Sequence, residues 1–189
     1  MPESEPATSL PQRAISLFGI AATAVLASGF LGGVTSAING AVSPQYFVTI
    51  MHWHEISDVW RAAIAQGTFE GLCFGVFFST LFTAGIGIIT HTSCTYAFGM
   101  RHLRGVLAAA FVCWCLGGVL GTGLAMLSPE FYHATFRGVP DDLAAMLRFA
   151  WVGGSIWGIE FGGLLSVVLG LVVVRSSWRR CSQSTSEKC

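Results

Sequence analysis

The segment Leu31-Gly32-Gly33-Val34 recurs later in the chain as Leu116-Gly117-Gly118-Val119. A second pair of similar segments follows, with Ser43-Pro44-Gln45-Tyr46-Phe47 after the first copy and Ser128-Pro129-Glu130-Phe131-Tyr132 after the second. The two pairs are separated by the same interval along the chain. Because two unrelated motifs recur in the same order and at the same spacing, the sequence predicts an internal repeat.

Small residues spaced four positions apart extend this repeat on both sides. They form matching sets in the two copies: Gly67, Gly71 and Gly75 in the first, and Gly154, Gly158 and Gly162 in the second. The preceding apolar segment of each copy carries the same spacing, through Gly32 in the first and through Gly117 and Gly121 in the second. Ridges of small residues let helix backbones approach closely within a membrane. We therefore predict that these glycines pack helices against one another.

Four apolar stretches surround these motifs, at residues 14–42, 62–90, 105–127 and 149–174. Each reaches the length of about 20 residues that a helix needs to cross a bilayer. Charged residues make up only 11% of the chain, compared with about 25% in typical soluble domains. The predicted fold class is an all-α integral membrane protein, with four transmembrane helices arranged as two tandem parallel helical-hairpin repeats.

The repeat and the apolar stretches divide the chain into five parts. We expect a disordered N-terminal tail at 1–12, the first repeat at 13–90, a cytoplasmic loop at 91–104, the second repeat at 105–175 and a cytoplasmic tail at 176–189. Two copies of an even number of spans have the same orientation, so the repeat is of the parallel kind.

Orientation follows from the distribution of basic residues. Seven lie on one side of the predicted spans: Arg13, Arg101, Arg104, Arg175, Arg179, Arg180 and Lys188. Only three lie on the other side: Arg61, Arg137 and Arg148. Because cytoplasmic loops are enriched in Lys and Arg, we expect a multi-pass protein with both termini in the cytoplasm.

The Ser-Pro-aromatic segments fall where each first span ends. Serine favours the N-cap of a helix and proline its first position, so Ser43 and Ser128 predict the start of a short helix. The aromatic residues around them fit the aromatic belt at a membrane interface. The alternative is a binding lip for a ligand outside the membrane.

Glu70 and Glu160 are the only formal charges within the apolar stretches. Ionisable groups inside a bilayer are costly, and function is the first hypothesis for them. In repeat register the two acids lie three residues apart, which places them about one helical turn apart in depth on a similar face. One interpretation is a pair of protonated structural carboxyls, each bonded to a neighbouring Ser, Thr or backbone carbonyl. The other is a proton or cation site, with Glu160 as the first candidate.

The remaining chemistry-bearing residues give weaker signals. His52 and His54 could share a face and bind a metal only if their segment is extended, and we predict neither a metal nor a cofactor. The chain carries no nucleophile-and-base motif, zinc-protease motif or phosphate-binding loop. We therefore expect that it is not an enzyme.

Two classes of function stay open on this basis. The first is a small proton, cation or solute transport component that uses a buried glutamate. The alternative is a non-catalytic membrane scaffold or subunit that packs against partner helices through its glycine ridges. The expected partners are the lipid bilayer and either further copies of this chain or other membrane subunits. The net charge of zero gives no reason to expect a nucleic acid.

Overall fold

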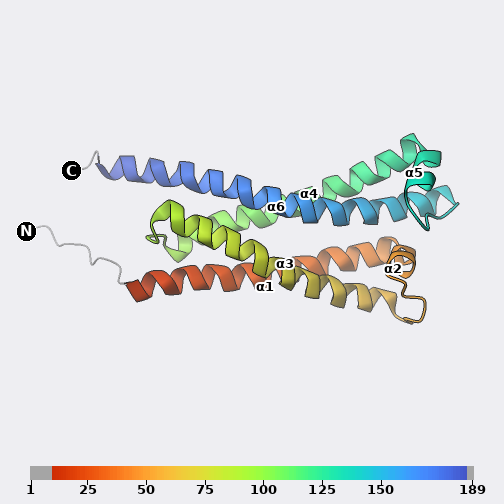
Figure 1. The fold of residues 1–189 in the computed structure, drawn as a ribbon, viewed down its shortest axis with the longest axis horizontal. Helices are drawn as coiled ribbons and strands as arrows, with labels where there is room; N and C mark the ends of the chain where they lie inside the picture. Colours follow the sequence, from red (N-terminus) through yellow and green to blue (C-terminus); the bar gives the residue numbers. More distant parts are fainter. Residues whose placement is uncertain (1–9, 187–189) are drawn as a thin grey trace, which may run out of the picture.

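The computed structural model describes residues 10–186, which form six helices (Figure 1). The four long helices are α1 (Leu10–Val42), α3 (Val59–Thr90), α4 (Tyr96–Leu127) and α6 (Leu143–Ser186). Two short helices, α2 (Pro44–Ile50) and α5 (Pro129–Thr135), lie in the connections after α1 and α4. Each half of the chain therefore contributes a long helix, a short helix and a second long helix.

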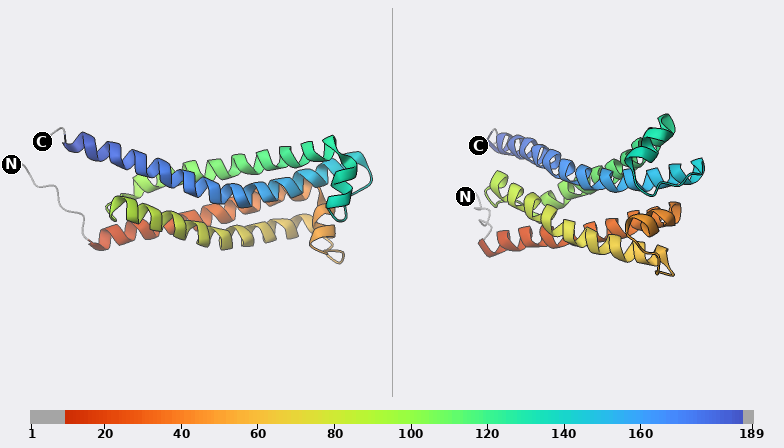
Figure 2. Two further views of the ribbon diagram at one scale, coloured as in Figure 1. Left: turned by 45° about the horizontal axis from the view of Figure 1, so that its top comes forward. Right: turned by 45° about the vertical axis from the view of Figure 1, so that its right-hand side comes forward.

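The long helices pair within each half of the chain. α1 packs along α3, and α4 packs along α6, while the two hairpins touch mainly through α1 with α4 and α3 with α6. Both hairpins run in the same direction (Figure 1 and Figure 2). We call the end where α1 begins and α6 ends the terminal end, and the opposite end, which carries α2 and α5, the short-helix end. The predicted fold class is confirmed.

Each of the long helices is suited to cross a membrane. The candidate spans are Arg13–Val42, Val59–Thr90, Tyr96–Leu127 and Leu143–Cys181. Their outer faces expose large apolar side chains, among them Phe18, Leu120 and Leu127. Large apolar surfaces of this kind are rare on soluble monomers and match the hydrocarbon of a bilayer. The chain is an integral, multi-pass membrane protein.

Polar side chains mark most of the helix starts. Asp58 accepts a hydrogen bond from the backbone N–H of Arg61 at 3.0 Å, and Asp142 accepts one from that of Ala145 at 2.8 Å. Ser43 occupies the N-cap position of α2, as expected, but its hydroxyl makes no capping bond. The proline that follows it fits the first turn of a helix because its missing N–H would have had no partner there.

The helices extend further than the apolar stretches indicate. The loop expected at 91–104 is shorter in the structure, because Thr95 caps α4 and the helix begins at Tyr96. The tail expected at 176–189 continues α6 as far as Ser186. At the other end, α1 begins at Leu10 within the expected tail, and residues 1–9 lie outside the described part of the chain. Hydropathy marks the apolar part of a helix and not the polar turns that continue it into the interface.

Glycines bring the two helices of each hairpin into backbone contact. A Cβ atom placed on Gly32 would meet the carbonyl oxygen of Gly67, and one placed on Gly117 would meet that of Gly154. Similar contacts surround Gly71 and Gly158 on the facing helices. The two hairpins therefore cross in the same way, and the close approach requires residues without side chains.

The buried apolar side chains form two clusters separated along the bundle. One, toward the terminal end, includes Ile20, Phe82 and Leu103. The other, toward the short-helix end, includes Phe47, Met146 and Phe149. Between these two clusters lies the cavity described next.

Candidate functional site: an acidic cavity between the hairpins

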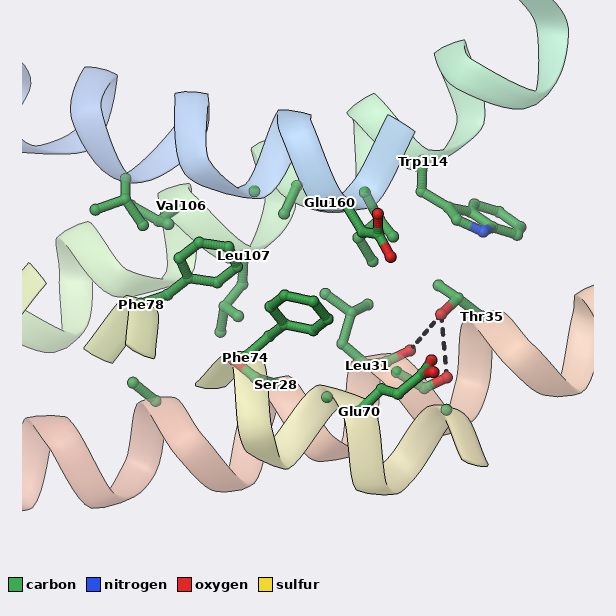
Figure 3. A pocket seen from close by; sticks show the side chains of 18 of the residues that line it. Ser28, Leu31, Thr35, Glu70, Phe74, Phe78, Val106, Leu107, Trp114 and Glu160 are labelled. Carbon is green, nitrogen blue, oxygen red and sulfur yellow. Dashed lines mark hydrogen bonds between the residues drawn. The ribbon is translucent and has the colours of Figure 1, made fainter. Parts of the chain in front are cut away.

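A cavity of about 120 Å³ lies between the two hairpins and is lined by residues of all four long helices (Figure 3). A single water requires about 10–15 Å³ of such space, so the cavity has room for several waters or a small ligand. Both predicted acids, Glu70 of α3 and Glu160 of α6, line it. Their carboxyl groups point into the cavity from opposite hairpins (Figure 3).

Glu70 is held by a neighbour on its own helix. The amide Nε2 of Gln66, one turn earlier in α3, donates a hydrogen bond to Oε1 of Glu70 at 2.6 Å. This contact orients Glu70 and satisfies part of its hydrogen-bonding capacity. The partner is a glutamine amide and not the Ser, Thr or backbone carbonyl that the structural interpretation names.

Glu160 lacks such a partner. Within residues 10–186, no side chain or backbone group forms a hydrogen bond or an ion pair with its carboxyl, which is only partly buried. The oxygens of Glu160 are therefore available to a water, a proton or a cation in the cavity. The two acids differ in their hydrogen bonding.

The cavity is polar in one half and apolar in the other. Thr35 lies beside the glutamates, and its hydroxyl donates to the carbonyl oxygens of Leu31 and Gly32, at 3.0 and 3.1 Å (Figure 3). Four more Ser or Asn side chains line the cavity: Ser28, Ser36, Asn39 and Ser79. Toward the terminal end the lining becomes apolar, with Phe74 and Phe78 at that side of the acids (Figure 3).

Trp114 of α4 adds a polar group that the sequence pattern did not single out. Its side chain is almost fully buried and lines the cavity, yet its indole N–H donates to no acceptor in the described chain. The ring is fixed by stacking on Phe111, with centroids 5.3 Å apart, and by an edge contact with Trp151 at 5.8 Å. An indole N–H buried this deeply normally has a partner, which a bound molecule in the cavity can provide.

Tyr46 does not line the cavity but belongs to the buried cluster toward the short-helix end. Sequence placed it in the aromatic belt, but it is buried beside Phe149 of α6, with ring centroids 4.9 Å apart, and packs over Gly153. Burial raises the pKa of Tyr46, and the negative charges of Glu160 and Glu70 raise it further. The phenol therefore lies within electrostatic range of both acids.

Asn39 and Ser155 join the hairpins at the same level. The hydroxyl of Ser155 lies 3.1 Å from Oδ1 of Asn39, to which it donates, and both residues are buried. Thr68 stands at the position that matches Ser155 and also carries a hydroxyl, but Asn39 has no polar equivalent in the other copy, where Leu124 stands. No simple pattern in the sequence indicates this contact.

Other residues singled out from the sequence lie away from the cavity. His52 and His54 are exposed in the loop after α2, with ring centroids 6.3 Å apart. The described residues contain no group of three or more His, Cys, Asp or Glu side chains that could hold a metal. Two carboxyls among hydroxyls are better suited to a proton or a monovalent cation, because tightly held divalent cations need more oxygen ligands.

The fold and the cavity define the class as a polytopic helical membrane protein with two acids facing one internal space. Comparisons with protein-family models, with curated proteins and with solved structures find no match to this chain. The geometry of the cavity is therefore the basis for assigning a function to this chain.

Proposed function

We propose that the protein is a small transport component that binds a proton or a cation between Glu70 and Glu160. The observation that carries this proposal is that both carboxyl groups line one cavity between the hairpins. A charge at the centre of a bilayer costs about 3 kcal/mol on insertion scales, and two carboxylates that share a site cannot both ionise freely. A proton shared between them, or a cation bound between them, removes both penalties.

Glu160 is the working group in this proposal, and Glu70 is its partner. Gln66 already satisfies one oxygen of Glu70, whereas Glu160 has no such bond within residues 10–186. A proton or cation that enters the cavity would therefore bind more favourably to Glu160 than to Glu70. The hydroxyls of Thr35 and Ser28, together with any waters present, would complete the coordination of a cation.

The two apolar clusters on either side of the cavity would act as barriers. A transported ion must pass one of them in each direction, so the clusters must open in turn. Movement of one hairpin against the other would do this, since rocking of one repeat around a central site is a common transport mechanism. The arginines at the terminal end support an orientation with both termini in the cytoplasm. A homo-oligomer could supply further parts of the pathway.

The scaffold alternative has less support. It relies on glycine ridges that are free to pack against partner helices. Gly32, Gly71, Gly117 and Gly158 are instead in contact within their own hairpins, and no acid in a cavity is needed for a scaffold.

The proposal is tested by reconstituting the full chain in liposomes that contain a pH-sensitive dye. An imposed potential should drive proton flux, or the flux of one cation among Na⁺, K⁺ and a small organic ammonium. Glu160→Gln should reduce this flux by tenfold or more, and Glu70→Gln should reduce it less. The matched control is Glu130→Gln, which alters an exposed acid in α5.

Wild-type flux no higher than that of empty liposomes would refute transport. Equal flux in wild type and in Glu160→Gln would refute the role of the cavity.

A further inference from the structure

A second concave region lies between α4 and α6 at the terminal end, apart from the acidic cavity. It is a groove of about 710 Å³. Its lining combines arginines with apolar and small residues of the spans, among them Arg101, Gly105, Val106, Ala109, Ser166 and Arg180. Of these residues only Val106 also lines the acidic cavity, so the groove has its own chemistry.

The part of the groove nearest the terminal end of the bundle is basic. Arg101 of α4 and Arg180 of α6 are both exposed there, beside His102. Neither arginine forms an ion pair within residues 10–186, where the one ion pair joins Arg61 to Asp58. All acidic residues of the described chain lie in the acidic cavity or toward the short-helix end: Glu55, Asp58, Glu70, Glu130, Asp141, Asp142 and Glu160. The positive charge at this groove is therefore not compensated by the described part of the protein.

The groove becomes apolar along the helices away from this end. From Arg101 to Ala109 it follows α4 for about 12 Å, and from Arg180 to Ser166 it follows α6 for about 21 Å, at the helical rise of about 1.5 Å per residue. These lengths bracket the thickness of one leaflet's hydrocarbon, which is about 15 Å. Gly105 contributes open space, because a Cβ atom placed on it would have no neighbour within 4 Å.

We propose that this groove binds one anionic phospholipid, with its phosphate between Arg101 and Arg180 and an acyl chain along the apolar walls of α4 and α6. Arginine can bind phosphate oxygens through two parallel N–H donors. Basic pockets between transmembrane helices are known to suit anionic head groups. The groove has two arginines at one end and apolar walls about as long as one leaflet is thick. This combination favours a lipid over a soluble phosphate. This proposal is independent of the proposed transport function.

The test uses the full-length protein purified in detergent, with added phosphatidylglycerol or phosphatidylcholine and native mass spectrometry to count bound lipids. Wild type should retain one phosphatidylglycerol in preference to phosphatidylcholine. Arg101→Gln and Arg180→Gln should each weaken this retention about fivefold, the effect expected for one basic residue near an anionic lipid. The matched controls are Arg104→Gln and Arg179→Gln, since both arginines are exposed at the same end but do not line the groove.

Gly105→Leu tests the acyl part of the site. It should fill the groove and weaken lipid retention at least tenfold without altering the fold. Gly123→Leu is its control, because Gly123 also has open space around it but lies on α4 far from the groove.

Equal losses in the groove variants and the control arginine variants would show only diffuse surface charge and would overturn the proposal. Displacement of the lipid by glycerol phosphate at similar concentration, with no effect of Gly105→Leu, would indicate a soluble phosphate site and would also overturn it.

Discussion

The hydroxyl of Ser155 in α6 donates a hydrogen bond to Oδ1 of Asn39 in α1, across 3.1 Å and between the two hairpins. Ser155 also lies 2.9 Å from the carbonyl oxygen of Val152, one turn earlier in its own helix. The contact lies between the acidic cavity and the apolar cluster at the short-helix end. It therefore ties the two hairpins together at the level where a transport movement would separate them.

A double-mutant cycle with Asn39→Ala and Ser155→Ala should give a coupling free energy of roughly 0.6–1.7 kcal/mol, the range measured for hydrogen bonds between membrane helices. The free energy of unfolding in mixed micelles provides the measurement. Ser166→Ala is the control for Ser155→Ala, because the Ser166 hydroxyl bonds only within α6, to Gly162. Its coupling to Asn39→Ala should be close to zero, and a coupling as large as that of Ser155 would contradict the assignment.

Gly117→Ala should destabilise the protein by about 1–3 kcal/mol, as overpacking in a core does. The added methyl group would meet the backbone of Gly154 and Gly158, which cannot rotate away as a side chain can. Gly123→Ala is a matched substitution on the same helix with no atom nearby. It should be neutral or stabilising by up to about 1 kcal/mol, because alanine favours a helix over glycine. Similar unfolding curves for both variants would show that close backbone approach does not hold this hairpin together.

Tyr46 offers an optical probe of the cavity. The chain has three tyrosines, so Tyr46 can be titrated alone after Tyr96→Phe and Tyr132→Phe. Because the charge of Glu160 raises the pKa of Tyr46 more than that of Glu70 does, Glu160→Gln should lower this pKa further than Glu70→Gln. The ultraviolet absorbance of the phenolate reports the shift. Glu130→Gln should leave it unchanged, and an unaltered titration in Glu160→Gln would mean that the two groups do not interact.

Tyr132 should make stability depend on pH in the alkaline range. Burial raises its pKa to about 12, with a smaller contribution from Tyr46, against an ordinary value near 10. The folded state therefore favours the protonated phenol. Its contribution to stability is complete below about pH 10 and is lost as the pH rises toward 12, by roughly 2–3 kcal/mol in total. The unfolding free energy of wild type should fall relative to that of Tyr132→Phe over this window, and a constant difference would refute the shift.

Cysteine labelling tests the orientation. Cys181 is exposed near the terminal end, whereas Ser57 is exposed in the loop at the short-helix end. In a background with every cysteine replaced except Cys94 and the one under test, a membrane-impermeant maleimide should label Ser57→Cys in intact cells and label Cys181 only after lysis. Cys94 is an internal control, since burial raises the pKa of its thiol and should keep it slow to react on either side. Labelling of Cys181 in intact cells would reverse the proposed topology.

The sequence was sufficient to predict the four spans and the pairing within each hairpin. Those features depend on local properties, namely the length of the apolar stretches and the spacing of small residues. Both copies of the repeat carry the same pattern. The start of α4 and the end of α6 were less well predicted. Hydropathy does not detect the capping of α4 by Thr95 or the polar residues that continue α6.

Only the tertiary structure decided how the two hairpins face each other. Repeat register placed Glu70 and Glu160 one turn apart on a similar face, but it could not show that both carboxyls would enter one cavity. Trp114 lines the cavity, and Tyr46 lies within electrostatic range of both acids, only through packing between helices that are distant in sequence. The relative placement of two hairpins depends on side chains from all four long helices at once, and no periodicity along a single helix encodes it.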